Sequence, residues 1–300
     1  MTTPALAPYV PYYASRAPYI TPAEYTAAPT AVNATNLVAG GSQAQNTNEL
    51  FNVIARASSM ADTICHQILA ATLDVQAGSY RIRNGVIRVP VDNTPLLAVN
   101  SVSLGWHPNT MQALTDLSGL WIQRKVVSIP INGISPVSPS PNYPTYPITP
   151  GYGQILAEVG YVNGWPNTTL AAPASASATS ITVADALGIY PGTPMQVYDD
   201  SPGNEPVVVA STYTIGSTTV PLTTGLQFQH AAGVSVSSLP PAIKQAVIHL
   251  TSALIKTRGS LSIVAGKLQG APSKTQLQDV GAHDDMSEAQ ALLAPYARVR

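Results

Sequence analysis

The sequence predicts a mixed α+β protein with a small helical core and a β-element, an inserted all-β module and an extended N-terminal arm. Two runs have apolar residues at spacings of three and four, which predicts amphipathic helices over 46–71 and 238–259. Between them, short apolar/polar alternations bounded by Gly, Pro and Asn predict strands. We therefore divide the chain into an arm (1–45), a core segment (46–165), an inserted β module (166–238) and C-terminal helices (239–300).

The N-terminal arm intersperses Pro with Tyr, as in "PALAPYVPYY". Proline fixes φ and removes a backbone donor, so this segment is predicted to be extended. It lacks a periodic apolar face and needs another surface to lie on, unless it is simply a disordered terminus. Tyrosine suits surfaces that are apolar on one side and wet on the other, which makes Tyr9, Tyr12 and Tyr13 candidates for a subunit interface.

The first helix is predicted to begin at a capping box formed by Asn46 and Glu49. Cys65 lies beside its apolar stripe and is expected to be a buried, unreactive small side chain. As the only cysteine of the chain, it cannot form an intrachain disulfide. The stripe itself comprises Leu50, Ile54, Ala57, Ala61, Ile64 and Ile68.

The stretch "SYRIRNGVIRVP" predicts a β-hairpin with a type I′ turn at Asn84-Gly85. Its core face would hold Tyr80, Ile82, Ile87 and Val89. The other face would carry Arg81, Arg83 and Arg88, two of them directly opposite each other, which normally destabilises a sheet. Two interpretations remain open: an anionic group, such as a carboxylate of a neighbouring subunit or a phosphate, covers this face, or the three arginines are simply solvated.

Further strands are predicted over 95–106, 119–131 and 153–165, and the Pro-rich stretch 132–153 is a candidate contact loop. The module then repeats short strand patterns every 10–15 residues. A last helix is predicted over 284–300, started by Asp285 and Glu288 as a capping box and broken at Pro295.

Composition and motifs argue against several functions. Charged residues make up 10% of the chain and the formal net charge is −1, so bulk electrostatics does not favour nucleic-acid binding. The five histidines have no metal-ligand spacing, and the chain has neither a nucleophile elbow nor a phosphate-binding loop. No apolar run has the length of a membrane span, and the N-terminus does not read as a secretory signal. We therefore expect no enzyme activity, cofactor, metal or membrane partner, and assembly in a cytoplasm.

Several weak motifs occur together in one order: "YITPAEYTAAPTAV" (19–32), "IARASSMADTICHQILAATLD" (54–74), "DLSGLWI" (116–122), "YVNGWPNTTLAA" (161–172), "TSITVADALGIYPGTPMQVYD" (179–199), "FQHAAGVSVSSLPPAIKQAVIHLTSALIKTRG" (228–259) and "SEAQALLAPYARV" (287–299). As an ordered set they resemble the head-tail connector (adaptor) proteins of long-tailed bacteriophages, especially those of actinobacterial phages. The long Tyr/Pro arm and the inserted β module depart from minimal members of that family.

The resemblance implies a structural virion protein that catalyses nothing. Copies would form a homo-oligomeric ring, commonly of twelve, that docks on the portal protein after DNA packaging, extends the DNA channel and receives the next neck protein, a stopper or tail terminator. DNA would be passing cargo only. Carried over by position, the portal contacts would be Leu292, Leu293, Pro295, Tyr296, Arg298 and Arg300. The alternative from a different class is a carbohydrate-binding or adhesin-type virion protein that uses the β module of residues 168–238.

Overall fold

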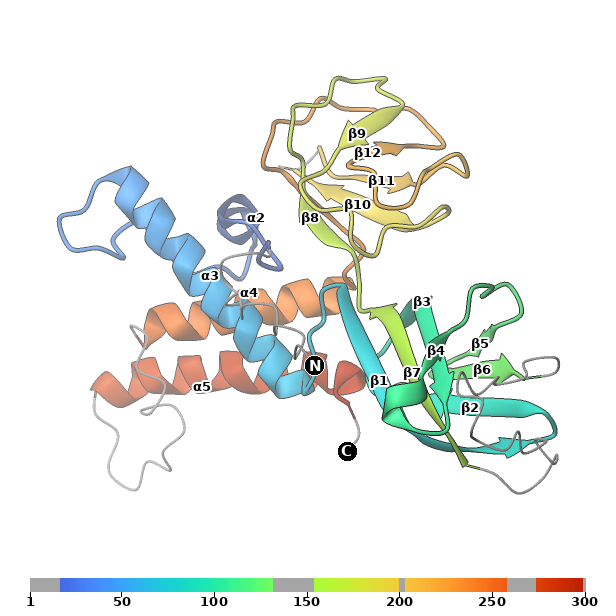
Figure 1. Cartoon of the computed structure of the whole chain (residues 1–300). Coiled ribbons are helices and arrows are strands. Elements are labelled where there is room, and N and C mark those ends of the chain that lie inside the picture. Colours follow the sequence, from blue (N-terminus) through green and yellow to red (C-terminus); the bar gives the residue numbers. More distant parts are fainter. Residues whose placement is uncertain (1–16, 132–153, 200–202, 258–273, 299–300) are drawn as a thin grey trace. The chain divides into compact units, whose positions relative to one another are not determined.

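The computed structural model describes residues 17–131, 154–199, 203–257 and 274–298, with only the backbone described over 274–283 (Figure 1). The chain forms two compact units, one of residues 1–69 with 166–300 and the other of residues 70–165. The first unit contains the helices and the inserted β module, and the second contains a seven-stranded sheet. The mixed α+β prediction is confirmed. The predicted core segment 46–165, however, combined a helix of the first unit with strands of the second.

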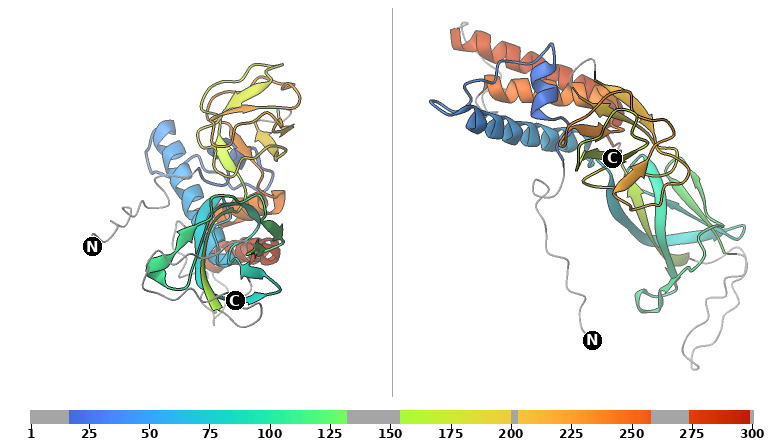
Figure 2. Two further views of the ribbon diagram at one scale, coloured as in Figure 1. Left: turned by 45° about the vertical axis from the view of Figure 1, so that its right-hand side comes forward. Right: turned by 90° about the horizontal axis from the view of Figure 1, so that it is seen from above.

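Three long helices of the first unit lie side by side: α3 (Gln43–Cys65), α4 (Pro241–Lys256) and α5 (Lys274–Leu293) (Figures 1 and 2). The stripe predicted for α4 is wholly buried, and most of the stripe predicted for α3 is buried as well. Ala57 and Ala61 are fully buried, so the small side chains lie where α3 meets its neighbours. Ile64 and Ile68 are only half-buried, because the helix ends between them.

The ends of α3 differ from the prediction. The helix begins after Ser42, whose side chain accepts a bond from the backbone N–H of Gln45 while Gln45 bonds back to Ser42. Asn46 is a buried residue of the first turn instead of the cap. The helix ends at Cys65 because His66 adopts the left-handed conformation, with φ at 53°, so the predicted end at residue 71 was wrong.

Helix α5 begins ten residues before the predicted start and ends at Leu293, where the short helix η3 (Ala294–Tyr296) follows. Asp285 therefore lies inside the helix and not at its start. It accepts a bond of 2.6 Å from the Nζ of Lys256 and lies 3.4 Å from the Nδ1 of His249, both on α4. The acidic pattern that resembled a cap thus serves to join two helices.

Residues 22–27 form a short helix, α2 (Pro22–Ala27), where the sequence predicted an extended arm. The side chain of Thr21 accepts from the N–H of Glu24, Glu24 bonds back to Thr21, and Pro22 occupies the first helical position. Residues 43–45, which were also assigned to the arm, belong to α3, and residues 1–16 lie outside the described residues.

The inserted module is all-β, as predicted. A four-stranded antiparallel sheet has the order β11 (Glu205–Val208), β10 (Pro194–Tyr198), β13 (Ser235–Ser237), β8 (Asn167–Thr169). A two-stranded ribbon pairs β12 (Thr219–Pro221) with β9 (Ser180–Thr182). Its core is aliphatic and includes Val197, Val209, Val220 and Val236.

The second unit is one antiparallel sheet whose strand order is β4 (Gln112–Ala113), β3 (Leu96–Gly105), β7 (Gln154–Asn163), β1 (Thr72–Arg83), β2 (Val86–Pro90), β6 (Val126–Pro130), β5 (Trp121–Gln123). A short helix η1 (Pro108–Thr110) joins β3 to β4. The strands curl around a single aliphatic core that includes side chains from both β3 and β6 (Figure 1).

The predicted hairpin is confirmed. Asn84 and Gly85 have φ of 51° and 72°, as a type I′ turn requires, and Ile82 pairs with Ile87. The two isoleucines are buried and the arginine face is exposed. The candidate contact loop 132–153 lies outside the described residues.

Candidate functional site

The C-terminal segment, residues 292–298, is fixed to the end of α3. The side chain of Gln67 donates to the carbonyl of Tyr296 at 2.9 Å, and the backbone N–H of Arg298 donates to the carbonyl of Cys65 at 2.8 Å. The Sγ of Cys65 lies 3.8 Å from the carbonyl oxygen of Leu293. The segment is therefore an ordered part of the helical layer.

The predicted portal-contact residues differ in how accessible they are. Pro295 is exposed, and Leu292, Tyr296 and Arg298 are half-buried. Leu293 is fully buried within its own chain, so in this conformation it supports the surface and cannot contact a partner. Arg300 lies outside the described residues. The accessible members lie within seven residues of one another on either side of the buried Leu293, and their contact with a portal stays a prediction.

The interface candidates of the hairpin are all exposed. Arg81, Arg83 and Arg88 point away from the aliphatic core of the second unit. Each of the three arginines pairs with a neutral residue in the sheet: Arg81 with Gln154 of β7, Arg83 with Val86 of β2, and Arg88 with Ser128 of β6. Tyr9, Tyr12 and Tyr13 lie outside the described residues.

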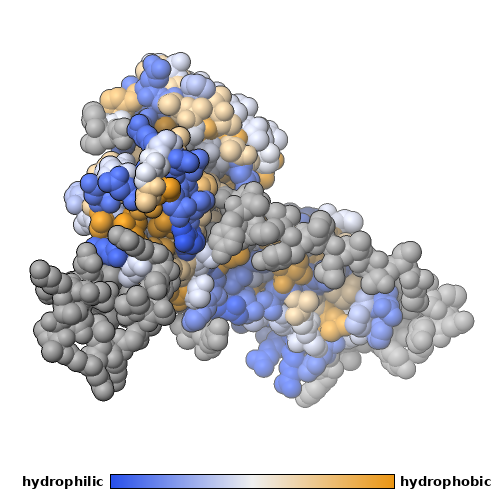
Figure 3. Space-filling view, turned by 90° about the vertical axis from the view of Figure 1, so that its left-hand side faces the viewer, coloured by the Kyte–Doolittle hydropathy of each residue, from blue (hydrophilic) through white to orange (hydrophobic). Residues whose placement is uncertain are grey.

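Several apolar side chains that were not predicted to be exposed reach the surface of the second unit. Leu73 and Val75 share one face of β1 and are 57% and 62% exposed. Trp121 and Ile122 are exposed on β5, which is an edge strand. The alternation of apolar and polar residues from Leu73 onward could have indicated that Leu73 and Val75 lie on the same face of a strand. Figure 3 is turned toward the side of Figure 1 on which the helices lie, and there hydrophobic and hydrophilic side chains of the described residues lie next to one another.

Residues 17–32, which we call the strap, are held by aromatic anchors in the first unit. Tyr19, Ile20 and Tyr25 are at most 1% exposed. The hydroxyl of Tyr19 bonds the carboxylate of Asp62 on α3, and the hydroxyl of Tyr25 lies 3.1 Å from the Oγ of Ser252 on α4. The strap is therefore integrated into the core that α3 and α4 form.

A buried ion pair adds a charged contact to the strap. The Nζ of Lys244, on α4, donates to the Oε1 of Glu24 at 2.6 Å and lies 3.7 Å from the centre of the Tyr198 ring. It also donates to the Oγ of Ser235 at 3.3 Å. Burial lowers the pKa of Lys244, and the carboxylate of Glu24 opposes this shift. The cluster joins α2, α4 and the β module at one point.

A second buried cluster of titratable side chains lies inside the β module. The ring of His230 is fully buried between two carboxylates, with Nδ1 2.9 Å from Asp199 and Nε2 2.7 Å from Glu205. Glu205 also accepts backbone bonds from Gln227 at 2.7 Å and Phe228 at 3.2 Å. Burial raises the pKa of Glu205, but these bonds and His230 outweigh it, so the pKa lies below its ordinary value. Both ring nitrogens of His230 therefore have a carboxylate oxygen within hydrogen-bond distance.

Further observations concern metal ligation, thiol reactivity, membrane spanning and the exposure of aromatic side chains. Among the described residues, no three His, Cys, Asp or Glu side chains are placed to hold a metal ion. Burial, with a further contribution from the charge of Asp62, raises the pKa of Cys65 to about 12, which keeps the thiol protonated and unreactive. No helix in the described part of the chain has both the length and the apolar character to span a membrane. Of the module's aromatic side chains, Phe228 is exposed, Tyr190 and Tyr198 are half-buried, and Tyr213 is buried.

Comparison with known proteins gives little further information. No protein-family model and no curated protein sequence matches the chain. One solved structure, described as the neck of an empty GTA particle computed with C6 symmetry, contains a chain that aligns with 94% of this chain and 95% of its own. The identity is 13% and the TM-score is 0.31. This degree of similarity establishes neither a common fold nor a common function.

Proposed function

We propose that this chain is a structural protein of the head-tail neck of a bacteriophage particle, and that it acts through shape and contact, without catalysis. In the finer form of the proposal it is an adaptor. Twelve copies assemble in the host cytoplasm into a ring that docks on the portal after DNA packaging. The ring binds the next neck protein, a stopper or tail terminator, and lets DNA pass through its channel.

The observation that carries this proposal is the ordered set of connector-like motifs together with their place in the fold. The strap, α3, the β module and α4 all coincide with resembling stretches, as does the end of α5. These elements belong to one unit, and only 116–122 and parts of 54–74 and 161–172 fall in the other. Most of the residues that carry the resemblance therefore lie in one compact unit of the fold.

The buried polar groups support a structural role. The charges of Lys244 and Glu24 are paired with each other, and His230 is paired with Glu205. Polar side chains that are buried and paired with one another in this way join elements of the fold, which is what a structural role requires. The low overall charge and the exposed apolar residues Leu73 and Val75 suit a subunit that buries surface against other proteins.

Within the finer proposal, the accessible part of the C-terminal segment contacts the portal. Arg81, Arg83 and Arg88 meet carboxylates of a neighbouring subunit and do not line the channel. Each arginine facing DNA would add a salt-dependent attraction to phosphate, which would slow the passage of the genome.

The test combines assembly with imaging. The purified chain is mixed with portal rings of the same particle, and mass photometry should detect a ring-sized complex that the chain alone forms only weakly. Particles made without the gene should accumulate as DNA-filled heads separate from tails in electron micrographs. Normal particles in its absence would overturn the proposal. A cryo-EM map of the neck that placed the three arginines in the channel would overturn only their assignment.

A further inference from the structure

We propose that the strap is exchanged between copies, so that residues 17–32 of one chain occupy the groove between α3 and α4 of its neighbour. The inference rests on the proposed function, in which copies of the chain form a closed homo-oligomer. It names the element that joins one copy to the next. The chain that donates the strap also receives one, so the exchange passes around the whole ring.

The groove holds the strap at several separate points. Besides the aromatic anchors, the backbone N–H of Tyr19 donates to the Oγ of Ser58 on α3 at 3.1 Å. The side chain of Asn167 donates to the carbonyls of Ala17 and Pro18 at 3.0 and 3.1 Å. Lys244 holds the other end through Glu24. The strap thus makes specific contacts along its length, and an identical strap from another copy would reproduce every one of them.

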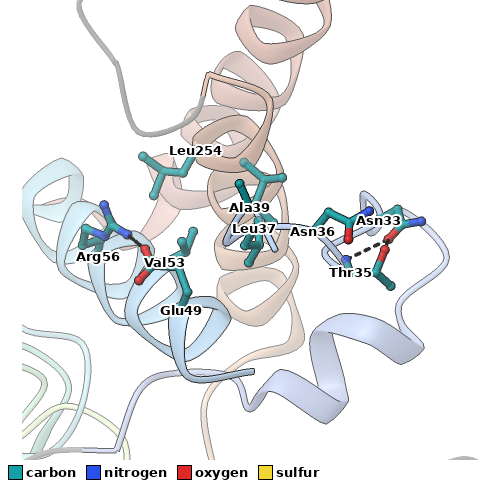
Figure 4. A pocket seen from close by; sticks show the side chains of 10 residues that line it. Asn33, Thr35, Asn36, Leu37, Ala39, Glu49, Val53, Arg56 and Leu254 are labelled. Atoms are coloured by element: carbon teal, nitrogen blue, oxygen red, sulfur yellow. Dashed lines mark hydrogen bonds and ion pairs between the residues drawn. The ribbon is translucent and has the colours of Figure 1, made fainter. Parts of the chain in front are cut away.

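The linker that follows the strap, residues 33–41, is packed much more loosely. One cavity of about 440 Å³ and another of about 520 Å³ adjoin it, and Asn33 and Thr35 line both. Figure 4 shows Leu37 and Ala39 of the linker facing Val53 of α3 and Leu254 of α4 around the first cavity. The linker has neither helix nor strand, and much of it is exposed.

One side chain fastens the linker to the helical layer. The Oδ1 of Asn46 accepts from the backbone N–H of Val38 at 2.9 Å, and its Nδ2 donates to the carbonyl of Gly41 at 3.3 Å. If these two bonds open, nine residues can extend to about 30 Å, roughly the diameter of a small domain. A tightly bound element on a loosely packed linker of this reach is the arrangement from which domain exchange occurs at low cost.

Charge reversal at the ion pair tests the exchange in the full-length chain. Glu24→Lys places two lysines together, and Lys244→Glu places two glutamates together, so each single variant should assemble at least tenfold less well than the natural chain. In an equimolar mixture the strap of either variant matches the groove of the other. Strap exchange therefore predicts that the mixture recovers most of the assembly, measured by mass photometry with portal rings.

The double variant E24K/K244E is the matched control. It restores opposite charges whether the strap docks within its own chain or on a neighbour, so it should assemble under either arrangement. If the double variant assembles while the mixture fails like the single variants, the strap stays within its own chain and the proposal is overturned. The proposed neck function would then stand, because a ring would still form.

Crosslinking gives a second readout that needs no substitution. A carbodiimide should join the carboxylate of Glu24 to the amine of Lys244, since both line a cavity of about 680 Å³ through which the reagent can enter. Chains grown in ¹⁴N and ¹⁵N medium are mixed as monomers, assembled and crosslinked. Exchange predicts that about half of the crosslinked peptide pairs combine both isotopes in the assembled fraction. Crosslinked pairs that contain only a single isotope would overturn the exchange. A chain that forms no oligomer under any condition would overturn both the exchange and the proposed ring.

Discussion

Replacing Glu205 by Gln should destabilise the β module, and the geometry around its carboxylate sets the size of the effect. Oε2 accepts from the N–H of Gln227, while Oε1 accepts from the N–H of Phe228 and faces the Nε2 of His230. A glutamine has one oxygen and one amide nitrogen. Whichever way its amide is turned, at least one of these N–H groups will face another donor.

The magnitude follows from the bonds that change. A hydrogen bond to a charged group contributes roughly 1.5–3 kcal/mol and a neutral one about 1 kcal/mol, while a buried donor without an acceptor costs about 1–3 kcal/mol. Two bonds that change from charged to neutral lose roughly 0.5–2 kcal/mol each, and the third leaves a donor unpaired at a cost of about 1–3 kcal/mol. The expected loss of stability is therefore about 2–7 kcal/mol. Glu158→Gln, on an exposed residue of β7, is the matched control and should change stability by less than about 0.5 kcal/mol.

Hydrogen exchange measured by mass spectrometry at increasing urea concentration is the suitable assay, because a chain of two units need not unfold in one step. Peptides from β10 and β11 should lose protection in the Glu205 variant, while those from the second unit should not. Equal protection in the two proteins would refute the reasoning.

The same residue predicts a pH dependence. The folded pKa of Glu205 lies below its unfolded value of about 4.3, so its stabilising effect is complete above that pH and is lost as the pH falls through the folded pKa. The natural protein and the Gln variant should therefore differ in stability at pH 7, and the difference should shrink as the pH falls below about 4.3. A difference that stayed constant down to pH 3 would contradict the assignment.

Three further predictions concern other elements. Cys65 should react with iodoacetamide at pH 8 far more slowly in the folded chain than in urea, and labelling at equal rates would contradict its burial. Because its folded pKa of about 12 exceeds the unfolded value, the stability it contributes is present below about pH 8.5 and lost as the pH rises toward 12. Ala57→Leu should destabilise the helical layer by about 1–3 kcal/mol through overpacking, as measured by urea unfolding, whereas Ala44→Leu on the exposed start of α3 should not. Gly85→Ala should cost the second unit about 1–2 kcal/mol, because φ is 72° at that position, and unchanged exchange protection in β1 and β2 would rule out the type I′ turn.

Local patterns predicted those elements whose residues interact with near neighbours in the sequence. The hairpin at Asn84-Gly85 and the buried stripe of α4 follow from periodicity and turn chemistry alone. The start of α3 could not be decided locally, because Ser42 with Gln45 and Asn46 with Glu49 are both capping patterns. The choice depends on Asn46, which binds the backbone of Val38 and Gly41 and so becomes buried.

The interaction sites were harder to predict because they depend on distant contacts. The sequence pattern predicted Asp285 to be a helix cap, but in the structure it pairs with Lys256 of α4. Leu293 was predicted to contact a partner, but it is buried against the end of α3. The prediction that the strap is extended was wrong for a different reason, because its helix α2 has a local sequence signal. The sequence Thr21-Pro22-Ala23-Glu24 contains both a capping box and a proline at the first helical position, and the surrounding tyrosines and prolines obscured it.

The ion pair between Glu24 and Lys244 also has a consequence for synthesis on the ribosome. The two residues are 220 positions apart, so at roughly 5–20 residues per second the strap is made about 10–45 s before α4 exists to receive it. During that interval the contiguous residues 70–165 can fold, whereas the discontinuous unit must wait for its second half. Neighbouring ribosomes on one messenger RNA therefore hold several exposed straps at once, close to newly completed α4 helices. During this period a strap can dock either on its own chain or on a neighbouring chain.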